Sequence, residues 1–261
     1  MSLYGEEVSN LSSPTDPHPT YPNPIIQEAL CEIQFRQPDG SNWDPACLSQ
    51  FYKEIQSDYP TFEPILQMAL VLQEGPQGFQ GIHPAAPQQK MRYKHSNGTR
   101  ILQLGDGIFT VNLLPPYPGW KEMSGIILEA WSKVLAVINI KEISRIGLRY
   151  INRINKENAD EKPLAWLEPS DYIAKSVLSS FPGFLSRSET CIENDRKVVV
   201  TFADMDEPEE SYVLDIDCIA TKIMGSDSSA IGAEIEHLHQ IEWDVFSASK
   251  TERLDDFMCR K

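Results

Sequence analysis

The segment KMRYKHSNGTRILQLGDGIFTVNLL, residues 90–114, decides the fold class of this chain. Asn97 and Gly98 form the dipeptide most typical of a two-residue β-hairpin turn, because both residues tolerate positive φ angles. Residues 90–96 and 99–104 flank that turn as two strands. Gly105-Asp106-Gly107 then marks a second turn before the apolar residues 108–114. The segment therefore predicts a three-stranded antiparallel meander.

The spacing of apolar residues predicts further strands and helices on both sides of this meander. Residues 26–35 alternate, which places Ala29, Cys31, Ile33 and Phe35 on the core face of a strand. Apolar side chains recur every three to four residues after Asp44 and again over residues 120–138, which is typical of amphipathic helices. Further strands are expected at residues 142–154, 184–193, 197–203 and 212–220, with a short helix near 170–179 and a long helix after residues 225–229.

These elements predict an α+β fold with mainly antiparallel sheets that are covered by amphipathic helices. Residues 1–20 are poor in apolar side chains and are expected to form a flexible arm. The polar run NKENADEKP at 155–163 is the best linker candidate. We therefore expect two similar-sized subdomains, an N-terminal one over 21–154 and an acidic C-terminal one over 164–261. Each contains a meander that is followed by a long helix, but residue-level similarity is too weak to establish a repeat.

Composition limits the class of protein. The net charge of −15 argues against a protein that coats nucleic acid through bulk charge, although it leaves local nucleic-acid contacts open. The five cysteines are isolated, which favours reduced thiols over a disulfide framework or a zinc site. No apolar stretch is long enough to span a membrane, and the acidic, polar N-terminus does not resemble a signal peptide. A cytoplasmic location is expected.

The negative charge is unevenly placed. Residues 1–155 hold 12 basic and 15 acidic residues, whereas residues 156–261 hold 11 and 23. The acidic C-terminal part, which includes Glu234, Glu236 and Glu242, is expected to form a solvated surface. The alternative is an electrostatic surface that faces a basic partner or the chain's own N-terminal half.

The most suggestive group of side chains is basic. Arg145, Arg149 and Arg153 fall on one face of the strand at 142–154, and we call them the arginine stripe. Such a stripe can bind phosphates or carboxylates. It can equally be a solvated face, pair with the acidic half of the chain, or bind a protein partner.

Asp215 and Asp217 offer the one candidate metal site. They lie two residues apart in an expected strand, so both carboxylates point to one face, a geometry that suits Mg²⁺. The Gly-Ser loop that usually precedes such a pair in nucleotidyl-transfer enzymes is missing, because Gly225-Ser226 follows it. An ordinary strand with an exposed acidic face is the simpler interpretation, and no metal or other cofactor is expected.

Other residue types that often carry chemistry do not assemble into a motif. His237 and His239 point in different directions on a helix and are expected to be surface residues. The chain has no Gly-x-Ser-x-Gly elbow and no P-loop. Cys31 and Cys218 occupy apolar strand positions and are interpreted as small core residues.

Four segments resemble a family of uncharacterised, sporadically distributed bacterial proteins. The opening segment YPNPIIQEALCEIQF, residues 21–35, is similar to the family's N-terminal signature Asn-Pro-(Pro)-Ile-x-Glu-x-x-x-Glu, with Ile25 in place of a second proline. The other three segments are residues 116–120 (PYPGW), 146–152 (IGLRYIN) and 214–217 (LDID). The resemblance implies no established activity. The family's patchy distribution implies a loose association with mobile elements or antiviral defence.

Two functions follow as expectations. The first is a non-enzymatic interaction or adaptor protein of a bacterium, a subunit in a defence or mobile-element-linked system. Its partner would be a protein with a basic surface or a second copy of the chain. The alternative is a Mg²⁺-dependent enzyme that processes nucleotides or nucleic acid with Asp215 and Asp217. The unevenly placed charge and the missing catalytic motifs favour the first.

Overall fold

The structure is a computed structural model that describes residues 18–39, 41–67, 70–75, 78–84, 88–158, 160–179, 183–205 and 210–260, with the side chains of 67–89 left out. Most of the predicted flexible arm, residues 1–17, lies outside the described residues. No helix in the described ranges is both long and apolar enough to cross a membrane.

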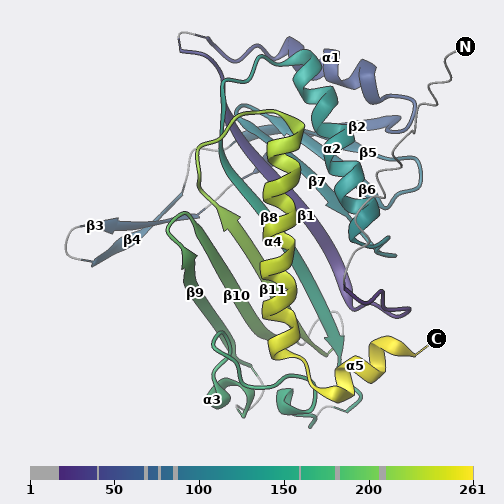
Figure 1. Cartoon of the computed structure of the whole chain (residues 1–261), viewed down its shortest axis with the longest axis vertical. Coiled ribbons are helices and arrows are strands. Elements are labelled where there is room, and N and C mark those ends of the chain that lie inside the picture. The colour runs from purple at the N-terminus through teal and green to yellow at the C-terminus, as the bar shows by residue number, and fades with distance from the viewer. Residues whose placement is uncertain are drawn as a thin grey trace, which may run out of the picture.

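One antiparallel sheet dominates the described chain (Figure 1). Its nine strands run in the order β2-β5-β6-β7-β1-β8-β11-β10-β9. Their bounds are β1 (Ile26–Arg36), β2 (Thr61–Gln67), β5 (Gln88–Lys94), β6 (Arg100–Gly105), β7 (Ile108–Leu113), β8 (Glu142–Asn155), β9 (Leu185–Glu193), β10 (Arg196–Met205) and β11 (Ser211–Ala220). A separate hairpin of β3 (Leu70–Gly75) and β4 (Gly78–Pro84) projects from the main body.

The strand order shows that the two halves of the chain share one topology. In the first half, β1 lies beside β7, and the meander continues outward through β6 and β5. In the second half, β8 lies beside β11, and the meander continues outward through β10 and β9. β1 and β8 pair antiparallel in the middle of the sheet, with Ile33 opposite Ile146. Each half therefore contains one strand, a three-stranded meander and a long helix, and the first half also carries β2 beside β5 and the β3–β4 hairpin.

Helices cover one face of this sheet. α2 (Trp120–Val137) follows the first meander and α4 (Ser228–Ser249) follows the second. They pack against each other and against β7, β8 and β11, while α1 (Ala46–Ile55) packs on α2 (Figure 1). The short α3 (Lys175–Leu178) and α5 (Glu252–Cys259) lie at the end of the sheet near β9 and α4. We call the opposite face of the sheet the rear face.

The local predictions that came from periodicity are confirmed. The hairpin predicted around Asn97-Gly98 is present, but its turn is longer than the two residues predicted: the strand pairing ends at Lys94 and Ile101, and the N–H of His95 donates to the backbone oxygen of Arg100. Gly98 has a φ of 75°, whereas Asn97 does not take a positive φ. The alternation of β1 places its core face toward the helices, where its four predicted core residues are buried: Ala29, Cys31, Ile33 and Phe35. α2 begins at Trp120 and buries its predicted apolar face.

The two predicted subdomains do not form two separate sheets, because their strands belong to one sheet. β8 pairs with β1 on one side and with β11 on the other, so the proposed halves share one continuous sheet. The linker predicted at 155–163 starts where β8 ends, at Asn155. The two halves join because the backbone groups on the free edges of β1 and β8 would otherwise be unpaired, and pairing these two edges satisfies them.

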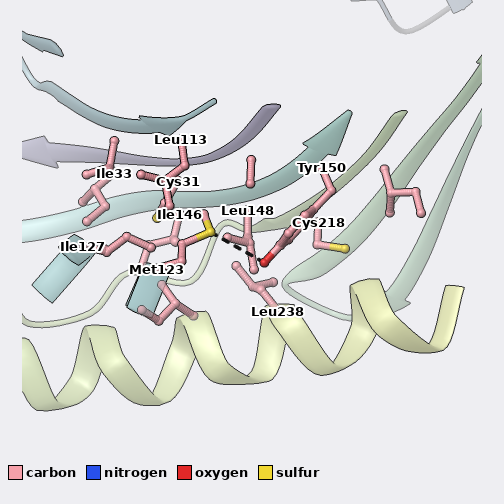
Figure 2. Packing of buried hydrophobic residues seen from close by; sticks show 14 of the residues in the cluster. Cys31, Ile33, Leu113, Met123, Ile127, Ile146, Leu148, Tyr150, Cys218 and Leu238 are labelled. Carbon is pink, nitrogen blue, oxygen red and sulfur yellow. Dashed lines mark hydrogen bonds between the residues drawn. The ribbon is translucent and has the colours of Figure 1, made fainter. Parts of the chain in front are cut away.

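The core lies between the sheet and the helices (Figure 2). Figure 2 shows Tyr150 of β8 pointing toward α4, beside Leu148 and Cys218 and above Leu238, while Met123 and Ile127 of α2 lie on the same side of the sheet. Cys31 and Cys218 are fully buried, which confirms them as core residues. Burial raises the pKa of both thiols, so they stay uncharged.

Candidate functional site

An apolar pocket opens at one end of the helical layer. It lies between the start of α2, the second half of α4, the end of β8 and the segment that leads into β1. Its volume is about 100 Å³. Eight aromatic or imidazole side chains line it together with one carboxyl group, and we call it the aromatic pocket; these residues are His18, Tyr21, Tyr117, Trp120, Tyr150, His239, Trp243, Phe246 and Glu242.

Gly119 places the first wall of the pocket. Its φ of 93° turns the chain into α2 in a conformation that residues with a Cβ rarely adopt. Trp120 therefore becomes the first residue of α2 and stacks on the ring of His239 from α4, with 4.1 Å between the ring centroids. The indole Nε1 of Trp120 donates a hydrogen bond to Glu236 at 2.8 Å. This ring pair joins the two long helices at the pocket.

Glu242 is the most unusual group in the pocket. Its side chain lies on the buried face of α4, and the residue is only 5% exposed. No described residue donates a hydrogen bond to its carboxyl group or forms an ion pair with it. Burial among apolar neighbours disfavours the charged form and raises the pKa of Glu242 to about 8. At neutral pH most of these carboxyl groups are protonated.

Two further polar side chains in the pocket have unused hydrogen-bonding atoms. Among the described residues, the two ring nitrogens of His239 have no hydrogen-bond partner. The side-chain nitrogen of Asn152 has none either. Burial and the neighbouring His18 lower the pKa of His239 to about 3, so its ring is neutral. Buried polar atoms are nearly always paired in folded proteins. Three unpaired groups around one cavity therefore indicate a place for a ligand.

The floor of the pocket is formed by a tyrosine pair. The hydroxyl oxygens of Tyr117 and Tyr150 lie 3.1 Å apart, and the Tyr150 hydroxyl also donates to the sulfur of Met123 at 3.7 Å (Figure 2). Burial raises the pKa of Tyr150, so the hydroxyl stays neutral. The pair is a fixed polar edge on an otherwise aromatic surface.

The segment before β1 completes the pocket. His18 stacks on Trp243 with 4.6 Å between centroids, and Tyr21 donates a hydrogen bond to Asp255 of α5 at 2.7 Å. These contacts belong to residues 18–20 of the predicted arm and to the first residue after it. Within the described part of the arm, His18 packs on α4, whereas Pro19 and Thr20 are exposed, and the flexibility of the arm stays a prediction.

Three of the segments that carried the family resemblance meet at this pocket. Residues 21–35 contribute Tyr21 and Pro24, residues 116–120 contribute Tyr117 and Trp120, and residues 146–152 contribute Tyr150 and Asn152. They are far apart in sequence and come together only in the folded chain.

The arginine stripe lies elsewhere, on the rear face, and its members are paired within the chain. Arg149 donates two hydrogen bonds to Asp215, at 2.7 and 2.6 Å. Arg145 donates to Glu32 at 2.8 Å and has Asp217 at 3.8 Å. Arg153 donates to Ser211 at 3.0 Å. Binding of a partner by this stripe remains a prediction, and any partner would have to compete with these contacts.

The two aspartates share one face of β11, as predicted, but they face arginines. Asp215 and Asp217 form the contacts just described with β8. Burial raises the pKa of Asp217 although Arg145 and Arg149 lower it. In the described ranges no three His, Cys, Asp or Glu side chains gather as metal ligands would. Magnesium binding by this pair remains a prediction without geometric support.

Sequence reasoning missed the central residues of the pocket. His239 was expected at the surface but is buried, whereas His237 is exposed and lies 3.3 Å from Glu193. The solvated acidic surface does not include Glu234 or Glu242, which are both buried. Glu234 accepts two hydrogen bonds from Arg196, but Glu242 has no such partner. A signal was present, because Glu242 follows Leu238 by four residues on the apolar stripe of α4.

Comparison with models of protein families and with curated protein sequences finds no match for this chain. The family resemblance accordingly rests on the four quoted segments alone.

Proposed function

We propose that this protein is a non-enzymatic interaction protein that receives a small cationic group of a partner protein in the aromatic pocket. The group would be the protonated or methylated amine of a basic side chain. The buried carboxyl group of Glu242, which has no partner among the described residues, carries the proposal, because a bound cation would supply its counter-charge.

The surroundings of Glu242 suit an ammonium group better than other ligands. Aromatic rings attract cations through their electron-rich faces, and rings beside a carboxylate are typical surroundings of bound ammonium groups. The pocket of about 100 Å³ is smaller than the roughly 150 Å³ cavity that holds benzene, so it accepts the end of a side chain but no extended molecule.

The role of an adaptor fits the remaining observations. Three neutral polar groups, Asn152, His239 and the Tyr117 hydroxyl, can orient a bound group but do not form a nucleophile with a base. The net charge of −15 would also attract a basic partner at long range. The family resemblance and the association with defence or mobile elements remain expectations in this proposal.

Calorimetry with n-butylammonium, which mimics a lysine side chain, tests the proposal. We expect binding by the wild-type protein and a loss of about tenfold or more in Glu242→Gln, since that variant cannot provide a counter-charge. Asp244→Asn is the matched control, because it removes a carboxylate from the exposed side of the same helix. 1-Butanol has a similar shape without the charge and should bind more weakly than the amine.

A second measurement uses the raised pKa of Glu242. Because most of its carboxyl groups are protonated at neutral pH, binding of the ammonium ion should release close to one proton. Titrations in PIPES and ACES, whose heats of ionisation differ, measure that proton directly. Equal binding by Glu242→Gln, equal binding of 1-butanol, or no proton release would refute the proposal.

A further inference from the structure

A second hollow lies on the rear face of the sheet, far from the aromatic pocket. It has a volume of about 340 Å³ and is lined by side chains from β1, β2, β5, β6, β7 and β8. Three of its lining residues are cations, namely Lys90, Arg92 and Arg149, and one is an acid, Glu32. We call it the Lys90 hollow.

Lys90 is the group in this hollow that the fold does not explain. The residue lies on β5 and is only 2% exposed, although lysine is among the residues that are rarely buried without a partner. No described residue accepts a hydrogen bond from its ammonium group or forms an ion pair with it. Burial lowers the pKa of Lys90, and the charge of Glu32 only partly opposes that effect.

The carboxylates near the hollow are already occupied by other cations. Glu32 accepts hydrogen bonds from Arg145 at 2.8 Å and from Gln34 at 2.9 Å. Asp215 is held by both donors of Arg149. Each acid therefore has its own partner, and the charge of Lys90 is left without one.

The other cations of the hollow differ from Lys90 in this respect. Arg92 donates to Glu63 at 3.2 Å, and Lys94 on the same strand lies 2.9 Å from the same carboxylate. Arg92 nevertheless keeps a buried Nε without a hydrogen-bond partner among the described residues. The hollow thus offers one unpaired ammonium group and one unused guanidinium donor.

Neutral polar side chains line the wall next to Lys90. Gln103 of β6 donates to the amide oxygen of Asn112 at 2.9 Å, and Asn112 in turn donates to Glu28 at 2.5 Å. Thr110 of β7 is buried between Gln103 and Glu32 in the strand register. Leu30 and Leu66 give the hollow an apolar side. A charged centre with neutral polar and apolar walls is typical of a small-molecule site.

We propose that the Lys90 hollow binds the anionic group, a phosphate or a carboxylate, of a small organic molecule. The ammonium group of Lys90 supplies the counter-charge, the unused Nε of Arg92 supplies a further donor, and the apolar side contacts the rest of the ligand. The proposal is independent of the aromatic pocket, which lies on the other face of the sheet.

Calorimetric titration with inorganic phosphate and with acetate, at constant ionic strength, tests this proposal. The wild-type protein should bind at least one of the two anions, and the better one identifies the chemical class of the ligand. Lys90→Met should weaken that binding by about tenfold or more, because it removes an ammonium group that has no partner among the described residues. Lys94→Met is the matched control: it removes an exposed, paired cation from the same strand and should bind as the wild type does.

A measurement on the wild-type protein avoids dependence on the folding of the variant. The pKa of the Lys90 ammonium group can be followed through its Cε chemical shift. A bound anion should raise that pKa toward its ordinary value, since it stabilises the charged form. No binding of either anion, unchanged binding in Lys90→Met, or an unchanged pKa at saturating anion would overturn the proposal.

Discussion

The guanidinium group of Arg149 on β8 is joined to the carboxylate of Asp215 on β11 by two hydrogen bonds, from Nε at 2.7 Å and from Nη2 at 2.6 Å. The two residues are not direct neighbours in the register, because Asp217 lies opposite Arg149 and Asp215 lies opposite Ile151. The arginine therefore reaches diagonally across the sheet. It links the central strand of the second half to the strand that carries both aspartates.

We predict that this pair contributes modestly to stability. Its coupling energy in a double-mutant cycle with Arg149→Gln and Asp215→Asn should be about 1 kcal/mol, since Arg149 is 39% exposed and solvent screens the pair. Chemical denaturation of the four proteins measures it, and added salt should reduce it. A coupling energy near zero would mean that the pair is not formed in solution.

Gly147 has no side chain, and the space this leaves on the rear face is occupied by the guanidinium group of Arg145. A Cβ at Gly147 would lie 2.9 Å from Nη1 of Arg145, which donates to Glu32. We expect Gly147→Ala to displace the guanidinium group and to lower the free energy of unfolding by about 1 kcal/mol.

Gly125→Ala is the control for that variant. Gly125 lies on the exposed side of α2, with nothing within 4 Å of an added Cβ. This change should raise the free energy of unfolding by up to about 1 kcal/mol, because alanine favours a helix over glycine. If both variants shift stability in the same direction, contact with Arg145 is not what Gly147 provides.

Trp131 anchors α2 to the sheet. Its side chain is fully buried against Phe35 and Phe109, and its indole nitrogen donates to the backbone oxygen of Ser226 at 3.0 Å. Trp131→Ala should lower the free energy of unfolding by about 3–5 kcal/mol, as expected for a large cavity in a core. Urea denaturation measures the change. A loss below about 1 kcal/mol would place this helix face at the surface.

Glu242 should make stability depend on pH in a specific direction. Its pKa is raised from 4.5 to about 8, so the folded chain holds this proton more tightly than the unfolded chain does. The resulting stabilisation is complete below the unfolded pKa and is lost as pH rises through about 8. Glu242→Gln should therefore match the wild type near pH 5 and exceed it by the order of a few kcal/mol near pH 9.

Titration of His239 should destabilise the protein as pH falls, which is the opposite direction to Glu242, and Glu242→Gln should leave this effect unchanged. Its pKa is lowered from 6.5 to about 3, so its contribution to stability is lost as pH falls through that window. Melting temperatures of wild type, Glu242→Gln and Asp244→Asn over the pH range separate the two groups. A constant difference between wild type and Glu242→Gln at all pH values would show that Glu242 is charged in the folded protein.

Local structure could be predicted wherever neighbouring residues determine it. The hairpin around Asn97-Gly98, the buried side of β1 and the apolar face of α2 each depend on side chains a few residues apart, and all three are present, although the hairpin turn is longer than the two residues predicted. The arginine stripe was placed on one face of β8 for the same reason, because strand side chains alternate. What those arginines contact could not be read from that alternation.

The sequence by itself thus determined the α+β class and many of the elements with their buried faces, but not β2, β3 and β4. Only the tertiary structure decided that β1 and β8 pair, which makes one sheet of the two halves. It alone gathered His18, Trp120, Asn152 and Glu242 around one pocket, and it alone buried Lys90 where no described residue pairs with it. The physical reason is that hydrophobic period and turn chemistry act between near neighbours, whereas burial and charge pairing depend on residues that are distant in the chain.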